Sequence, residues 1–109
     1  MSVRLNILEN YLKEDPHDEF LRYALALEYK SLERIEESYE QFKILEKEHS
    51  EYLPMYYMAG KTAEALHFYD EALTWYSKGM DLAIKLENAH TLKELKGAYD
   101  MLKEEMSEE

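Results

Sequence analysis

The sequence predicts an all-α fold of six helices joined by short connections. Apolar residues recur at steps of three and four along nearly the whole chain, which is the spacing of one helical face. Only three glycines and two prolines occur in 109 residues, which is too few turn-forming residues for a fold with many β-turns. With 46% hydrophobic and 34% charged residues, the chain can fill a core and solvate a surface. Its length predicts a single domain over residues 1–109.

The first three helices each carry an apolar stripe at helical spacing. The stripes consist of Leu5, Leu8 and Leu12; of Leu21, Ala24, Leu25 and Tyr29; and of Ile35, Tyr39, Phe42 and Leu45. Asp15 and Pro16 end the first helix, because proline cannot continue the backbone hydrogen bonds of a helix. Asp18 is a predicted N-cap for the second helix.

The last three helices follow the same spacing. Their stripes consist of Met55, Tyr56, Ala59, Ala63 and Leu66; of Tyr69, Ala72, Leu73, Tyr76, Met80 and Ala83; and of Leu92, Leu95, Tyr99 and Leu102. Pro54 precedes the fourth stripe and is predicted to open that helix, where its missing N–H is not needed.

The middle of the chain contains two copies of one sequence pattern, 34 residues apart. A shift of 34 residues overlays the segment 22–26 on the segment 56–60, and it also overlays Ser38 on Ala72 and Phe42 on Tyr76. This period, with its small and aromatic positions, resembles the tetratricopeptide repeat (TPR), and the resemblance covers roughly residues 16–86.

The TPR resemblance implies a right-handed helical solenoid of about two and a half repeats, similar to small stand-alone bacterial TPR proteins. The expected parts are an N-terminal half-repeat helix at 3–14, repeats at 18–49 and 53–86, and a capping helix at 88–105.

Close helix crossings explain the small residues of the repeat. Ala26 and Gly60 are the expected crossing residues of the first helices, and Ser38 and Ala72 are those of the second helices, with Phe42 and Tyr76 as fillers beside them. Glu33 and His67 stand at the turn positions where the repeat usually has glycine, so strain from positive φ is expected there.

Charge and cysteine content exclude several classes of function. With 24 acidic and 13 basic residues the net charge is −11, which opposes binding to nucleic acid or to an anionic membrane. The absence of cysteine excludes disulfides, thiolate zinc sites and cysteine nucleophiles, and it favours a reducing compartment, the cytoplasm. The sequence shows neither a signal peptide nor an apolar run long enough to span a bilayer.

No catalytic site, cofactor or metal is expected. Glu46-x-x-His49 and Glu64-x-x-His67 have the spacing of a metal motif, but the TPR register separates the two histidines by roughly 20 Å or more. Glu64, His67 and Glu71 could form at most a weak surface site, and a solvated helix end is the simpler interpretation. No serine stands in a recognisable activating context, and no glycine-rich phosphate loop exists, so the chain is not predicted to be an enzyme.

The functional hypothesis is a peptide-binding groove. In a TPR stack the first helices line a concave surface, and Tyr23 and Tyr57 are 34 residues apart on those helices. The residues predicted to share that surface are Phe20, Tyr23, Leu27, Lys30, Tyr57, Lys61 and Glu64. The alternative is that these tyrosine rings pack on each other or under the terminal helices. The groove lacks the repeated Asn and Arg residues of TPR proteins that grip chaperone tails, so a chaperone-tail function is not supported. The net charge of −11 makes a neutral or basic protein or peptide the expected partner.

A rival hypothesis is self-association. The first helix has three further apolar or aromatic residues outside its stripe, Val3, Ile7 and Tyr11. They could form the contact between two chains of a homodimer with a two-fold axis.

Overall fold

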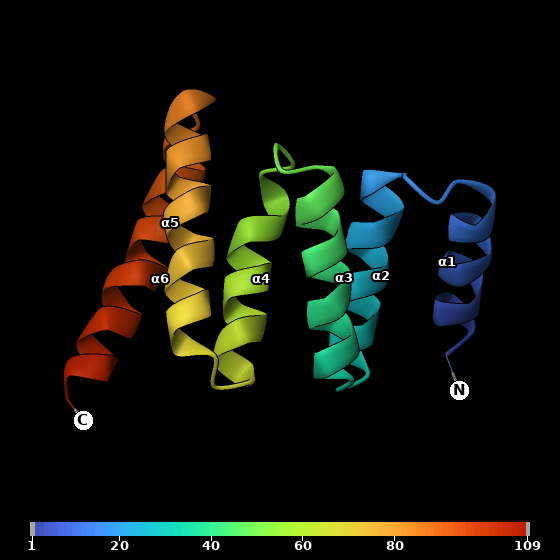
Figure 1. Cartoon of the computed structure of the whole chain (residues 1–109), viewed down its shortest axis with the longest axis horizontal. Helices are drawn as coiled ribbons and strands as arrows, with labels where there is room; N and C mark the ends of the chain where they lie inside the picture. The colour runs from blue at the N-terminus through green and yellow to red at the C-terminus, as the bar shows by residue number, and fades with distance from the viewer. Residues whose placement is uncertain (1, 109) are drawn as a thin grey trace. The chain divides into compact units, whose positions relative to one another are not determined.

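The computed structural model describes residues 2–108, and that part of the chain contains six α-helices and no strand (Figure 1). The helices are α1 (Val3–Glu14), α2 (Glu19–Ser31), α3 (Ile35–Glu48), α4 (Pro54–Ala65), α5 (Tyr69–Lys85) and α6 (Ala89–Ser107). The all-α prediction is confirmed, and α4 begins at the predicted Pro54. The closing helix continues to Ser107, two residues beyond the predicted end at 105. Among residues 2–108, no helix has the length and apolarity to cross a bilayer.

The chain divides into two compact units, Met1–Met55 and Tyr56–Glu109, which are described separately here. The single domain over residues 1–109 stays a prediction. In the first unit α1, α2 and α3 run antiparallel in turn (Figure 1). The predicted cap of α2 is confirmed, because the Asp18 carboxylate accepts a hydrogen bond of 2.8 Å from the Leu21 amide.

The first unit is held by one apolar cluster and one close crossing. Leu5 and Leu12 of α1 form a buried cluster with Leu25 and Tyr29 of α2. At the crossing of α2 and α3, Ala26 and Ser38 are completely buried, as is the predicted filler Phe42. The Ser38 hydroxyl donates a hydrogen bond of 2.7 Å to the Ala26 carbonyl, so the buried hydroxyl is satisfied where the helices touch.

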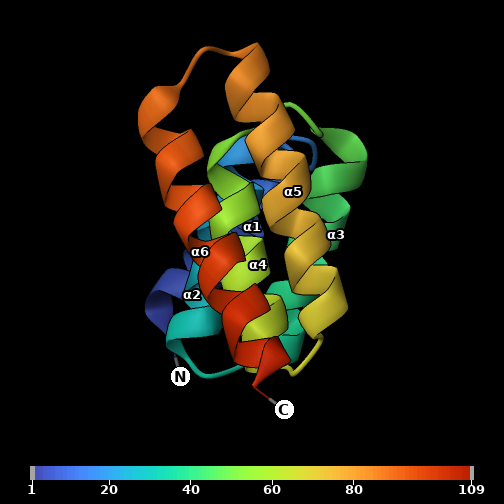
Figure 2. The ribbon, with the colours of Figure 1, turned by 90° about the vertical axis from the view of Figure 1, so that its left-hand side faces the viewer.

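The second unit packs α5 between two neighbours. Figure 2 shows α6 returning antiparallel to α5, to which it is joined by a short turn. Gly60 of α4 lies directly against the ring of Tyr76 of α5, with no room for a side chain. Gly79 of α5 lies in the same way against Tyr56 of α4 and Leu95 of α6. The predicted role of Gly60 as a crossing residue is therefore confirmed.

Three helices end in the same left-handed turn without glycine. Glu33 and His67 have φ values of 62° and 64°, so the strain predicted at both positions is confirmed, and Glu87 adds a third case at 55°. Each turn is closed by a backbone hydrogen bond that spans six residues. These bonds run from Arg34 N to Tyr29 O, from Phe68 N to Ala63 O, and from Asn88 N to Ala83 O.

Candidate functional site

A cavity lined by convergent polar side chains lies within the second unit, between α4 and α6. Its volume is about 510 Å³, a size typical of a ligand pocket. The lining residues are Tyr57 and Lys61 of α4 and His90, Lys93, Glu94, Gly97, Ala98 and Met101 of α6. This combination brings an aromatic ring, a thioether side chain and several charged groups to one surface.

Tyr57 and Lys61 are held in place by their neighbours. The Lys61 Nζ lies 5.7 Å from the centre of the Tyr57 ring and 3.8 Å from the Glu64 carboxylate. The same carboxylate accepts a hydrogen bond from the buried Tyr76 hydroxyl. The rings of Tyr57 and Tyr76 are 6.3 Å apart between centroids. The ammonium group and the ring are therefore held in position on α4.

Burial of the Tyr76 ring raises the pKa of its hydroxyl above the ordinary value for tyrosine. The hydrogen bond to Glu64 and the negative charge of that carboxylate raise the pKa further. The Tyr76 hydroxyl therefore remains protonated at neutral pH, and it holds the Glu64 carboxylate 3.8 Å from the Lys61 Nζ.

The predicted groove residues fall into two groups. Tyr57, Lys61 and Glu64 lie on α4 in the second unit and are brought together as described. The other four predicted residues, Phe20, Tyr23, Leu27 and Lys30, lie on α2 in the first unit.

Within the first unit, Phe20 is 67% exposed, whereas Tyr23 is half-buried. The Tyr23 ring packs against Phe42 and Tyr52, with centroid distances of 6.2 and 5.5 Å. Part of this ring is therefore used in packing against α3 and the connection that follows it.

The contribution of α6 to the pocket was missed by the sequence reasoning, which assigned residues 88–105 only a capping role. One signal could have revealed it. Lys93, Gly97 and Met101 follow each other at four-residue steps, so they share one helical face. A glycine in the middle of such a face leaves space, and a Cβ at Gly97 would meet no atom within 4 Å.

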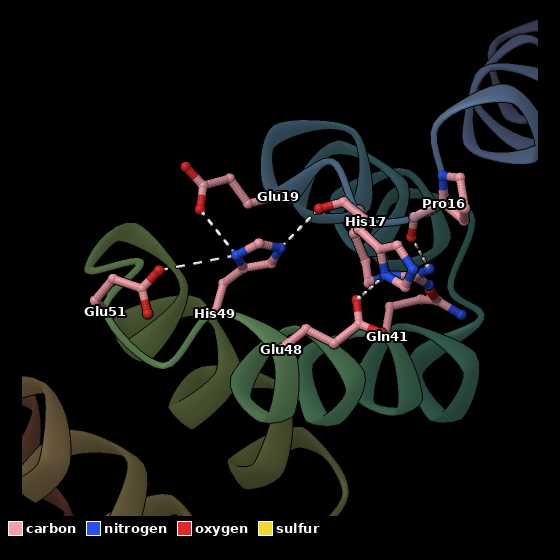
Figure 3. A network of polar contacts seen from close by, with 8 residues as sticks. Pro16, His17, Glu19, Gln41, Glu48, His49 and Glu51 are labelled. Atoms are coloured by element: carbon pink, nitrogen blue, oxygen red, sulfur yellow. Dashed lines mark hydrogen bonds and ion pairs between the residues drawn. The ribbon is translucent and has the colours of Figure 1, made fainter.

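A second polar cluster surrounds His49 in the first unit (Figure 3). His49 Nδ1 lies 3.3 Å from the Glu19 carboxylate and 3.8 Å from the Glu51 carboxylate. Its Nε2 lies 2.7 Å from the His17 carbonyl oxygen. Within residues 2–108, Glu19, His49 and Glu51 are the one group whose ligand atoms converge closely enough to hold a metal ion.

The sequence reasoning did not identify this cluster, because it paired His49 with Glu46 at motif spacing. Glu19 is 30 positions before His49 in the chain, so no short motif connects the two residues. They meet because the start of α2 lies beside the end of α3.

The chain is similar to several solved repeat proteins. One is a tetratricopeptide repeat domain protein from Salinibacter ruber, whose solution structure gives a TM-score of 0.76 at 31% identity over 80% of this chain and 88% of that chain. A crystal structure of a tetratricopeptide repeat domain protein from Salinibacter ruber gives a TM-score of 0.75 at 30% identity, over 79% of this chain and 96% of that chain.

The fold is also similar to that of PcrH, crystallised in complex with the chaperone binding region of PopD. The TM-score is 0.86 at 13% identity, over 94% of this chain and 77% of PcrH. No protein-family model and no curated protein matches the chain.

Proposed function

Because this chain belongs to the tetratricopeptide repeat family, we propose that it binds a peptide or protein segment in the pocket between α4 and α6. Helical-repeat proteins of this kind are interaction modules and not enzymes, and PcrH was crystallised with a segment of its partner. The observation that carries the proposal is the pre-oriented pair of Tyr57 and Lys61 at the edge of that pocket.

The pocket suits a segment with one apolar or aromatic side chain as its anchor. Tyr57 and Met101 supply contact area, and the space over Gly97 admits a side chain from the partner. Since Lys61 is already held by Glu64 and by the Tyr57 ring, little side-chain freedom is lost on binding. The cytoplasm is the compartment that we propose for this interaction.

Binding to short peptides tests the proposal. Peptides selected from a random library on the intact chain are expected to lose at least about tenfold in affinity for Tyr57→Ala, which removes the aromatic anchor. Gly97→Leu is expected to have a similar effect, because the leucine side chain would occupy the space in the pocket that the peptide needs. It should leave the fold intact, since a Cβ at Gly97 meets no atom within 4 Å. Fluorescence anisotropy with labelled peptides gives the Kd for each variant.

Ile84→Ala is the matched control, because Ile84 is 60% exposed on α5 in the same unit and does not line the pocket. Its affinity is expected to equal that of the unmodified chain. Peptides that bind Tyr57→Ala and Gly97→Leu as tightly as the unmodified chain would remove this pocket from the proposed function.

The charge of the partner is tested on the same peptides with Lys61→Glu. The net charge of −11 favours the approach of a neutral or basic segment, whereas Lys61 and Lys93 place positive charge in the pocket itself. Charge reversal at Lys61 should tighten binding of a basic peptide and weaken binding of an acidic one. We propose that the physiological segment is neutral or basic, and a preference of the unmodified chain for acidic peptides would contradict this.

Self-association is the second candidate, and the exposed face of α1 favours it. Val3, Ile7 and Tyr11 follow each other at four-residue steps and are 74%, 45% and 53% exposed. If this face pairs two chains, light scattering should give twice the monomer mass of 13.1 kDa at all but the lowest concentrations. Ile7→Lys should then restore the monomer, since it places a charge in the apolar contact. A mass of 13.1 kDa throughout the concentration range would exclude the homodimer.

A further inference from the structure

The His49 cluster contains the donor set of a metal site built from two segments of the chain, the start of α2 and the connection that follows α3. Glu19 is the first residue of α2, His49 is the C-cap of α3, and Glu51 lies in the turn that follows. The three ligand atoms all lie within 4.8 Å of one another. The His49 side chain is only 25% exposed, so its ring has a fixed position, while the carboxylates reach it from the solvent side.

The separation between Glu19 and His49 fits shared coordination better than direct hydrogen bonding. A charged N–H···O hydrogen bond is about 2.7–2.9 Å long, whereas the Glu19 and Glu51 oxygens lie 3.3 and 3.8 Å from His49 Nδ1. Two ligands of a tetrahedral zinc ion, each about 2.0–2.1 Å from the metal, are about 3.3 Å apart. Glu51 is the more exposed of the two glutamates, and rotation of its side chain would bring its carboxylate to the same spacing from His49 Nδ1.

The backbone already orients the imidazole for metal binding. His49 Nε2 lies 2.7 Å from the His17 carbonyl oxygen, which can only accept a hydrogen bond, so Nε2 carries the proton. In the neutral ring this leaves the lone pair on Nδ1, and Nδ1 is the atom that faces both carboxylates (Figure 3). A histidine that ligates a metal typically donates its other N–H to such a carbonyl.

From this geometry we propose that Glu19, His49 and Glu51 bind a divalent transition-metal ion, with Zn²⁺ as the best match and water as the fourth ligand. One imidazole with two carboxylates suits zinc, whereas Mg²⁺ and Ca²⁺ prefer sites made only of oxygen. The two carboxylates neutralise the charge of the ion. The bound ion would link the start of α2 to the end of α3, both within the first unit.

Titration with ZnCl₂ tests the site on the chelator-treated full chain. Isothermal titration calorimetry in the presence of excess Mg²⁺ is expected to show one zinc ion per chain. His49→Ala is expected to weaken zinc binding by at least about tenfold. Glu19→Gln and Glu51→Gln keep the size of each side chain but remove its charge, and each should weaken binding as well. The midpoint of thermal unfolding should rise with zinc for the unmodified chain and stay constant for His49→Ala.

His17→Ala is the matched control, because it removes the neighbouring imidazole and retains the backbone carbonyl that orients His49. Its zinc affinity should equal that of the unmodified chain. Long-range ¹H–¹⁵N correlation spectra of the unmodified chain should show a zinc-dependent shift at His49 Nδ1, a measurement that does not depend on any variant folding.

Three results would each overturn the proposal. They are the absence of zinc binding at millimolar ZnCl₂, an affinity of His49→Ala equal to that of the unmodified chain, and zinc-dependent shifts confined to His67 or His90. The last result would mean adventitious binding to surface histidines.

Discussion

Replacing Gly60 with alanine is expected to reduce the free energy of unfolding by about 2–3 kcal/mol, a large fraction of the stability of a chain of this size. A Cβ at this position would lie inside the volume of the Tyr76 ring. That ring cannot move aside easily, because Tyr76 is completely buried and its hydroxyl is bound to Glu64. Urea unfolding followed by the fluorescence of Trp75, which is 5% exposed in the same unit, gives the change directly.

Gly79→Ala is expected to behave in the same way. Its Cβ would come within 2.6 Å of the Tyr56 Cβ and 2.9 Å of Leu95 Cδ1. The first of these atoms is next to the backbone of α4, so relief requires the helices to separate. This loss should reach at least about 1 kcal/mol, and separation of the helices should also shift the emission of Trp75, whose ring lies 5.9 Å from that of Tyr56.

Gly97→Ala is the matched control for both substitutions. Gly97 is also helical, but an added Cβ there meets no atom within 4 Å. Alanine should raise the free energy of unfolding by about 0.5–1 kcal/mol, because glycine is the poorer helix former. If all three alanine variants unfold at the same urea concentration, the close helix contacts at Gly60 and Gly79 do not restrict the size of the side chain, and the prediction is wrong.

Alkaline pH is also expected to reduce the free energy of unfolding strongly, mainly through the ionisation of Tyr76. The unfolded chain ionises this hydroxyl near pH 10, the ordinary value for tyrosine, whereas burial raises the pKa of Tyr76 in the folded chain. Above about pH 10 the unfolded state therefore binds fewer protons than the folded state, and stability falls as pH rises. The expected loss is about 1.4 kcal/mol for each pH unit until the folded pKa is reached.

Tyr76→Phe separates this contribution from the others. The variant should be less stable at neutral pH by about 1–3 kcal/mol, because the Glu64 carboxylate loses its hydrogen-bond donor. Between neutral pH and about pH 11 it should lose less stability than the unmodified chain, since phenylalanine has no proton to release. Urea unfolding at both pH values measures the two slopes.

Tyr29 and Tyr52 in the first unit also have pKa values raised by burial and by nearby carboxylates, so the variant keeps some sensitivity to alkali. Identical pH dependence in the variant and the unmodified chain would show that the proton of Tyr76 does not contribute to stability.

The sequence by itself determined the helices and their crossings. Asp18 and Pro54 mark helix starts through local chemistry, and the apolar stripes follow from a period that every helix repeats. The 34-residue repeat identified Ala26 and Gly60, because a small residue is needed wherever helices of one repeat touch. Even the strained turns at Glu33 and His67 were predictable, since glycine is absent where the chain must reverse.

Only the tertiary structure decided which side chains form sites. The pocket combines Tyr57 and Lys61 with residues of α6. The four-residue spacing of Lys93, Gly97 and Met101 marks one face of α6, but only the packing of α6 on α5 decides that this face lies beside α4. In the same way, His49 meets Glu19 because two helix ends lie side by side, although 30 positions separate them in the chain. Helix formation depends on neighbours at three and four residues, which a sequence displays, whereas a site depends on distances between segments, which only packing sets.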